Sequence, residues 1–201
     1  MKHLYESDKH DILSKIDYIY ATVNNRLLPT FASIEKEAEA IEQARIEKLS
    51  ENFNPDYMDE ADILETAFHA GVEHYIIETE MKREFIKSAL TWLFHLFEKD
   101  CSYVFLTEDG NKKKAALAGL GINTSKGSEW YTCNKEMRIL ANAIKHGAGT
   151  SLNQLKLIRP DLFKNVSTII SDNKIELNEV ELGKYVTAMK NFWKNVFHQA
   201  M

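Results

Sequence analysis

The stretch from Asp59 to about Tyr103 constrains the fold most, because it reads as one or two long helices. Its later half, Phe85 to Phe97, is apolar almost all round, which is typical of a helix buried at the centre of a bundle. A polar line still follows one side of that half at three- and four-residue spacing, and it must meet polar partners. The line consists of Ser88, Thr91, His95 and Glu98. The sequence therefore predicts an all-α protein arranged around this helix.

Apolar residues keep helical spacing on both sides of this stretch. We expect further helices over residues 8–28, 30–50, 112–120, 130–145 and 179–199. Asn178 is expected to cap the last of these, and Val180 begins its expected inner face. The only strands that we expect are Ser167–Ile170 and Lys174–Leu177, which flank a Ser-Asp-Asn turn and would pair as a small β-hairpin near the C-terminus.

The turn signal Asn54-Pro55-Asp56 predicts a division of the chain. We expect residues 1–52 to form an N-terminal extension, an extra helix pair, and residues 53–201 to form the main helical domain. Cys101 and Cys133 stand alone, without the spacing of a zinc site or a disulfide framework. Neither a metal nor another cofactor is therefore expected.

The beginning of the chain is charged and lacks the apolar core of a secretory signal. The longest apolar run, Ala89 to Phe97, is far shorter than the roughly 20 residues needed to span a bilayer. We therefore expect a cytoplasmic protein that makes no use of a membrane. The formal net charge of −5 means that any contact with nucleic acid depends on a local basic patch.

Chemistry-bearing side chains concentrate at one helix end, before Gly147, which is expected to end the helix. On a helix, Arg138, Asn142 and Lys145 fall within one narrow sector and His146 lies at its edge. A histidine beside an arginine suits RNA cleavage by 2′-hydroxyl attack, because that reaction needs proton transfer and stabilisation of phosphate charge. The simpler interpretation is that Lys145 and His146 only complement the dipole at the end of an ordinary helix.

Two segments together resemble the HEPN superfamily, the higher eukaryote and prokaryote nucleotide-binding helical domains. The first is the long helix that ends in an acidic residue, from Phe85 to Glu98, and the second runs from Glu136 to Gly147 with its Arg, Asn and His. The resemblance covers roughly Asp59 to the C-terminus.

The resemblance implies a dimeric, HEPN-like four-helix bundle. It implies a metal-independent endoribonuclease of a toxin–antitoxin or phage-defence system, or an inactive RNA-binding relative. The catalytic residues would be His146, Arg138 and Asn142. The family's arginine usually directly precedes the asparagine; Ala141 occupies that position here, and Arg138 lies one turn earlier on the same face.

Further polar residues are candidates for supporting roles. His95 and Glu98 form a polar pair that we expect to orient the site from the long helix. Lys112 and Lys113 with Lys145 are candidates for substrate binding, because they can contribute to a basic patch for RNA together with Lys114, Lys156, Arg159 and Lys164. His69 and His74 lie among glutamates but lack the Glu-x-x-His pairs of di-iron bundles, so we expect no metal there.

An alternative function belongs to a different class. The acidic segment Glu35 to Glu51 is expected to dock a basic target if the chain is a non-catalytic interaction protein, such as an immunity-type or antitoxin-like partner. The expected partners are therefore RNA, a second copy of the chain in a homodimer, and a protein of the antitoxin or immunity type.

Overall fold

The computed structural model describes residues 1–51, 53–163 and 174–201. All regular secondary structure in these residues is helical, which confirms the all-α prediction. They form two compact units, Met1–Asn24 with Ile86–Met201 and Asn25–Phe85. The boundary expected near residue 52 lies inside the second unit, because the helices before and after it pair with each other.

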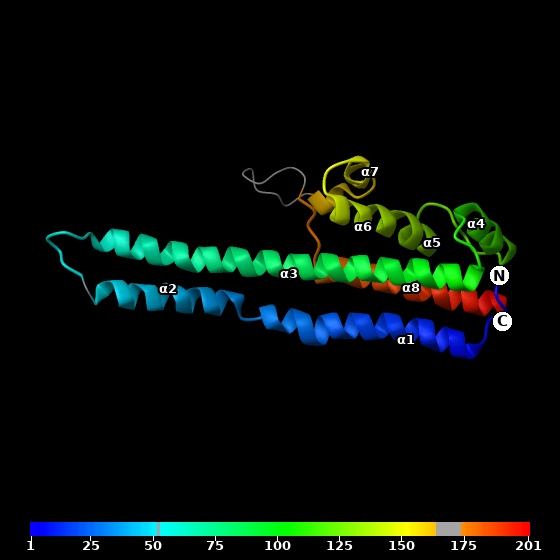
Figure 1. The fold of residues 1–201 in the computed structure, drawn as a ribbon, viewed down its shortest axis with the longest axis horizontal. Coiled ribbons are helices and arrows are strands. Elements are labelled where there is room, and N and C mark those ends of the chain that lie inside the picture. Colours follow the sequence, from blue (N-terminus) through cyan, green and yellow to red (C-terminus); the bar gives the residue numbers. More distant parts are fainter. Residues whose placement is uncertain (52, 164–173) are drawn as a thin grey trace. The chain divides into compact units, whose positions relative to one another are not determined.

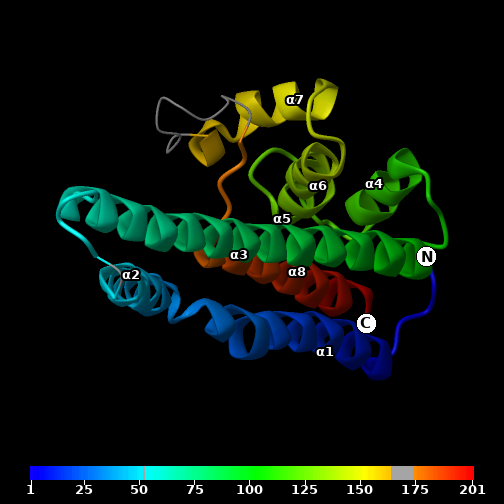
Figure 2. The ribbon, with the colours of Figure 1, turned by 60° about the vertical axis from the view of Figure 1, so that its left-hand side comes forward.

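The first unit contains most of the helices (Figure 1). They are α1 (Glu6–Thr22), the second half of α3 (Glu60–Phe105), α4 (Gly110–Gly119), α5 (Glu129–Tyr131), α6 (Met137–His146), α7 (Thr150–Ile158) and α8 (Glu179–Ala200). A π-helical turn, Thr132–Glu136, leads from α5 into α6, and a 3-10 turn, Pro160–Phe163, follows α7. In a second view, α8 lies between α1 and the second half of α3 (Figure 2).

Aromatic side chains form the centre of this unit. Phe97 of α3 lies 5.4 Å from Phe192 of α8, ring centroid to ring centroid, and 6.1 Å from Trp130 of α5. Such aromatic pairs add to the stabilisation that burial alone provides. The helix α3 is not buried all round, however, because Trp92 keeps 61% of its surface exposed. One side of the apolar segment therefore faces outward.

The second unit is a helical hairpin. It begins with a π-helical turn, Val23–Leu27, whose first two residues belong to the first unit, and a 3-10 turn, Leu28–Phe31. Helix α2 (Ile34–Ser50) then pairs with the first half of α3, where His74 Nε2 lies 3.3 Å from a carboxylate oxygen of Glu37. Gly71 permits this close pairing, since a Cβ at this position would lie 2.9 Å from the backbone oxygen of Ala38.

Three local features differ from the sequence-based expectations. Helix α7 was not predicted. Val180 was expected on the inner face of α8, yet it is 67% exposed, because it follows the cap at the open start of the helix. Residues 174–177 have no regular structure instead of forming a strand, and the other arm of the expected hairpin, 167–170, lies outside the described residues.

One local expectation is confirmed at the start of α8. The Asn178 side chain accepts a hydrogen bond from the backbone N–H of Glu181 and so caps α8 as predicted.

Among the described residues, no helix combines the length and the apolarity needed to cross a membrane.

Candidate functional site

Helix α6, which carries the predicted site, is fixed at both ends by local structure. Ser128 caps α5 by accepting a hydrogen bond from the backbone N–H of Tyr131 at 3.1 Å, and the π-helical turn then leads into α6. At the other end, Gly147 has a φ of 64° and donates its N–H to the carbonyl of Ala143 at 2.9 Å. A residue with a Cβ rarely adopts such a positive φ, so glycine suits this stop.

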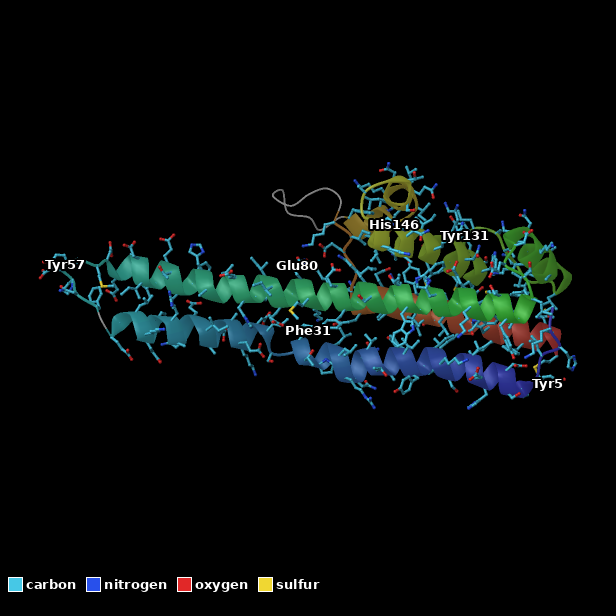
Figure 3. All side chains as sticks on the ribbon, in the orientation of Figure 1. Tyr5, Phe31, Tyr57, Glu80, Tyr131 and His146 are labelled. Atoms are coloured by element: carbon cyan, nitrogen blue, oxygen red, sulfur yellow. The ribbon has the colours of Figure 1, made fainter. Side chains whose placement is uncertain are left out.

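The two sides of α6 differ sharply in polarity. Met137, Leu140 and Ala141 are buried and lie at the three- and four-residue spacing of one helix face. Arg138, Lys145 and His146 are exposed and Asn142 is half-buried, so the four polar residues form one face. Figure 3 shows His146 at the end of α6. The buried side anchors the helix and leaves the polar face available to a ligand.

The charges on this face are not neutralised within the described part of the chain. No described residue forms a hydrogen bond or an ion pair with the side chains of Arg138, Lys145 or His146. Their donor groups can therefore be offered to an anion, such as a phosphate. We call Arg138, Asn142, Lys145 and His146 the α6 face.

Charge is distributed unequally between the two units. The chain has 25 Lys and Arg residues and 30 Asp and Glu residues. The second unit contains 6 of these basic residues and 15 of the acidic ones, which gives it a formal net charge of −9. The first unit contains the other 19 basic and 15 acidic residues, which gives it a net charge of +4. The α6 face thus lies on the basic unit, although the whole chain is acidic.

The supporting residues expected on α3 form a pair of their own. His95 Nδ1 lies 3.5 Å from a carboxylate oxygen of Glu98, and both side chains are about half exposed, at 57% and 50%. No hydrogen bond or ion pair joins this pair to the α6 face in the described structure. The orienting role of His95 and Glu98 stays a prediction.

The lysines of α4 have different surroundings from one another. Lys112 is exposed, whereas Lys113 is buried and its ammonium lies 3.4 Å from the hydroxyl of Ser102. Lys113 and the buried Leu117 are four residues apart and share the inner side of α4. Lys113 therefore presents its charge to Ser102 rather than to the surface.

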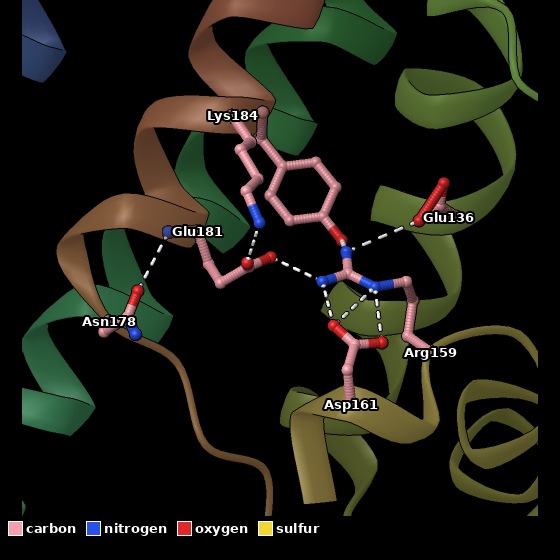
Figure 4. Close-up of polar contacts among 7 residues, drawn as sticks. Glu136, Arg159, Asp161, Asn178, Glu181 and Lys184 are labelled. Atoms are coloured by element: carbon pink, nitrogen blue, oxygen red, sulfur yellow. Dashed lines mark hydrogen bonds and ion pairs between the residues drawn. The ribbon is translucent and has the colours of Figure 1, made fainter.

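Arg159, expected in the basic patch, is instead the centre of a polar cluster (Figure 4). Its guanidinium lies 2.6 Å from Asp161, 2.5 Å from Glu181 and 3.5 Å from Glu136, and donates to the Tyr185 hydroxyl at 2.9 Å. Lys184 forms a further ion pair with Glu181. We call Arg159 and its four direct partners the Arg159 cluster. It ties the π-helical turn, the segment after α7 and the start of α8 together.

The electrostatics of the cluster are those of a structural site. Hydrogen bonding to Asp161 and Glu181 raises the pKa of Arg159, and the same contact lowers the pKa of Asp161. Burial acts to raise the pKa of Glu181, but hydrogen bonds from Arg159 and Lys184 outweigh it and the pKa is lowered. For Glu136 burial dominates over Arg159, and the pKa is raised. Arg159 is thus neutralised in place and is not available to a ligand.

Sequence reasoning did not find the Arg159 cluster. Glu136 and Glu181 lie 23 and 22 residues from Arg159, so no local spacing connects them. The available signal was the dipeptide Arg159-Pro160, because the residue before a proline avoids helix and so marks where α7 ends. Two further lysines were expected in the basic patch. The ammonium of Lys156 lies 5.7 Å from the ring centroid of Phe163, and Lys164 lies outside the described residues.

The histidines of the second unit form separate pairs with glutamates, and both cysteines are buried. His69 pairs with Glu65 at 3.6 Å and His74 pairs with Glu37 at 3.3 Å, each on its own. In the ranges 1–51, 53–163 and 174–201, no three His, Cys, Asp or Glu side chains converge as a metal site would require. Burial raises the pKa values of the Cys101 and Cys133 thiols, and this makes them poor nucleophiles.

The chain matches no protein-family model, no curated protein and no solved structure.

Proposed function

We propose that this protein binds RNA through the α6 face and cleaves it without a metal ion. The observation that carries the proposal is that Arg138, Lys145 and His146 share one face with Asn142, opposite a buried side, and have no hydrogen-bond or ion-pair partner among the described residues. The net charge of +4 on the unit that bears this face supports it, because phosphate contacts dominate the affinity for RNA. The biological setting that the HEPN resemblance implies is toxin–antitoxin or phage defence.

The proposed reaction is an internal transesterification. A basic nitrogen, His146 Nδ1 or Nε2, takes the proton of a ribose 2′-hydroxyl, and the 2′-oxygen attacks the adjacent phosphorus. The bond from phosphorus to the 5′-oxygen breaks, and a protonated imidazole supplies the proton that this leaving oxygen needs. The products are a 2′,3′-cyclic phosphate and a 5′-hydroxyl. Arg138 or Lys145 stabilises the charge on the phosphoryl oxygens, and the Asn142 amide positions the substrate.

One copy of the α6 face supplies a single histidine, whereas the reaction uses a base and an acid. We therefore propose a homodimer in which two copies of α6 face each other across a two-fold axis. In such a dimer, His146 of one protomer would act as the base and the second copy as the acid. Light scattering at micromolar concentration tests this, and a monomer that cleaves RNA would contradict it.

The experiment incubates the purified full-length chain with total RNA in EDTA. We expect cleavage by the wild type, with ends that carry a 2′,3′-cyclic phosphate. His146→Ala should lower the rate by about a hundredfold or more, the usual scale for loss of a general acid or base. His198→Ala is the matched control, because His198 is also exposed in the last turn of a helix, α8.

The proposal fails if the wild type leaves RNA intact, or if His146→Ala cleaves as fast as the wild type. Circular dichroism must show that His146→Ala keeps its helices, since a variant that unfolds would support the dipole role at the helix end instead. If RNA is bound and not cut, the chain belongs to the non-catalytic RNA-binding type. A filter-binding assay with single-stranded RNA at several salt concentrations measures that binding.

A further inference from the structure

The second unit, residues 25–85, presents an unusual surface. Twelve of the 21 large apolar side chains that are exposed in the described structure belong to it, although it contains less than a third of the chain. Single exposed apolar residues are ordinary, whereas a continuous apolar patch marks an interaction site.

Four apolar residues on the first half of α3 do share a face. Leu64, Phe68 and Tyr75 are 49%, 54% and 43% exposed, and Val72 between them is half-buried. Their spacing of four, four and three residues keeps them on one side of the helix. Together they cover about three helical turns, or roughly 17 Å at 1.5 Å per residue.

Carboxylates border this apolar face. Glu35, Glu39 and Glu42 of α2 line a groove of about 190 Å³, whose other walls include Val72 and Tyr75. Gly71 and Ala38 also line this groove, where the two helices approach closely. The face is thus apolar along α3 and acidic along α2, within one helical hairpin. We call it the hairpin face.

The net charge of the second unit indicates which class of partner can bind the hairpin face. A net charge of −9 opposes RNA, an anionic lipid surface and a second copy of the same unit, because each of these is negatively charged. A partner with apolar side chains along one side and cations beside them meets both features. An amphipathic helix of about three turns has that pattern and matches the length of the apolar face.

We propose that the hairpin face binds a basic amphipathic helix of a partner protein. The apolar side of that helix packs on Phe68 and Tyr75, and its Lys or Arg side chains pair with Glu39 and Glu42. Aromatic anchors in the middle of such an interface contribute most of the affinity, while the carboxylates raise the association rate and set the specificity. This inference does not depend on the α6 face, since the two lie on different units.

The test uses a labelled synthetic helix of Leu and Lys, about 18 residues long, with leucines at three- and four-residue spacing. Its binding to the full-length chain is followed by fluorescence anisotropy at about 0.15 M salt. Two further peptides serve as probes: one has the same composition in scrambled order, and the other has Glu in place of Lys. We expect binding of the Leu and Lys helix alone.

Paired variants locate the binding. Phe68→Gln should weaken it by about tenfold or more, the effect of losing a central aromatic anchor. Ile77→Gln should change it less than about twofold, because Ile77, 50% exposed, lies half a turn around α3 from Phe68. Glu39→Lys should also weaken binding, whereas Glu73→Lys, an equal charge change in a different groove of the hairpin, should not.

Three results would overturn the proposal. The first is equal binding of the scrambled or the acidic peptide, and the second is equal effects of Phe68→Gln and Ile77→Gln. The third is self-association of the chain that Phe68→Gln abolishes in sedimentation velocity, because a second copy would then occupy the hairpin face. Circular dichroism on each variant shows whether the helices are intact, as expected for substitutions at exposed positions.

Discussion

The guanidinium of Arg159 donates a hydrogen bond to the hydroxyl of Tyr185 at 2.9 Å, and this contact joins the end of α7 to α8. Tyr185 is buried, and burial raises the pKa of its hydroxyl, which therefore stays neutral. Arg159 also pairs with carboxylates of the π-helical turn and of α8. Arg159 thus links the turn before α6 and the end of α7 to α8.

Substitution of Arg159 should therefore be strongly destabilising. Arg159→Met keeps much of the side-chain volume but leaves the Glu136 carboxylate without its cation and Glu181 with only its ion pair to Lys184. Removing one partner of a buried ion pair costs about 3–5 kcal/mol. Urea unfolding followed by circular dichroism measures the loss. Lys184→Met is the control, because the Lys184 side chain is 62% exposed and forms its ion pair with Glu181 at the surface, and it should cost under about 1 kcal/mol. Equal losses in the two variants would contradict the central role of Arg159.

The carboxyl group of Asp100 should make the free energy of unfolding depend on pH. It is buried in the first unit, its Oδ2 has no hydrogen-bond partner among the described residues, and burial raises its pKa to about 6. Lys15 of α1 lowers this pKa, but Lys15 is itself paired with Asp11 at 2.5 Å. Between the unfolded value of 3.8 and the folded value of about 6, only the folded chain keeps the proton. Stability should therefore fall as the pH rises through this window.

The variant Asp100→Asn should remove that dependence. We expect its advantage over the wild type to grow by roughly 2 kcal/mol between about pH 4.5 and pH 7.5, measured as urea unfolding free energies. The comparison with the wild type is needed because Asp8, Asp161 and Glu181 have lowered pKa values, and their contributions are lost as the pH falls. An advantage that does not change with pH would show that Asp100 is ionised at both values.

Gly71 allows a sharp test of the helical hairpin. Alanine normally stabilises a helix interior relative to glycine by about 1 kcal/mol. At position 71, however, the added Cβ would meet the Ala38 backbone oxygen at 2.9 Å, and the backbone of α2 must move. We expect Gly71→Ala to destabilise the second unit by about 1–3 kcal/mol, as overpacking does.

The matched control is Gly119→Ala, because nothing lies within 4 Å of a Cβ at that helical position. It should be neutral or slightly stabilising. Hydrogen exchange of the α2 amides reports the effect locally, with faster exchange expected in Gly71→Ala alone. Unchanged protection of α2 would mean that the two helices do not pack as closely as the structure indicates.

Sequence reasoning predicted the helices whose buried faces repeat over several turns. Ile12, Ile16 and Ile19 of α1 and Leu182, Met189 and Val196 of α8 are buried at such spacing. Helix α7 escaped prediction because it has only nine residues, follows two glycines with positive φ, and its apolar signal rests on Leu152 and Leu155. Short helices receive most of their stability from tertiary packing, which no local pattern contains.

For the candidate site, the local part was predictable and the long-range part was not. Helical geometry alone places Arg138, Asn142, Lys145 and His146 on one face, and their exposure agrees with that. The burial of Lys113 and the ion pairs of Arg159 depend on residues from other parts of the chain. The sequence pattern of cations therefore does not show which side chains are paired and which are exposed. Ion pairs between distant segments are set by the fold.

Substitutions of Arg138 and of Lys145 can separate the roles of these two cations on the α6 face. Both side chains are exposed cations without partners among the described residues, but only guanidinium can bind a phosphate through two parallel hydrogen bonds. If Arg138 stabilises the phosphoryl charge, Arg138→Lys should lower the rate of RNA cleavage by about tenfold or more while Lys145→Arg retains it, and RNA affinity should change little. If Lys145 has this role, Arg138→Ala keeps full activity and Lys145→Ala loses it, and the assignment of Arg138 is wrong. Single-turnover rates at saturating RNA, measured beside filter-binding affinities, distinguish a loss in the chemical step from a loss in binding.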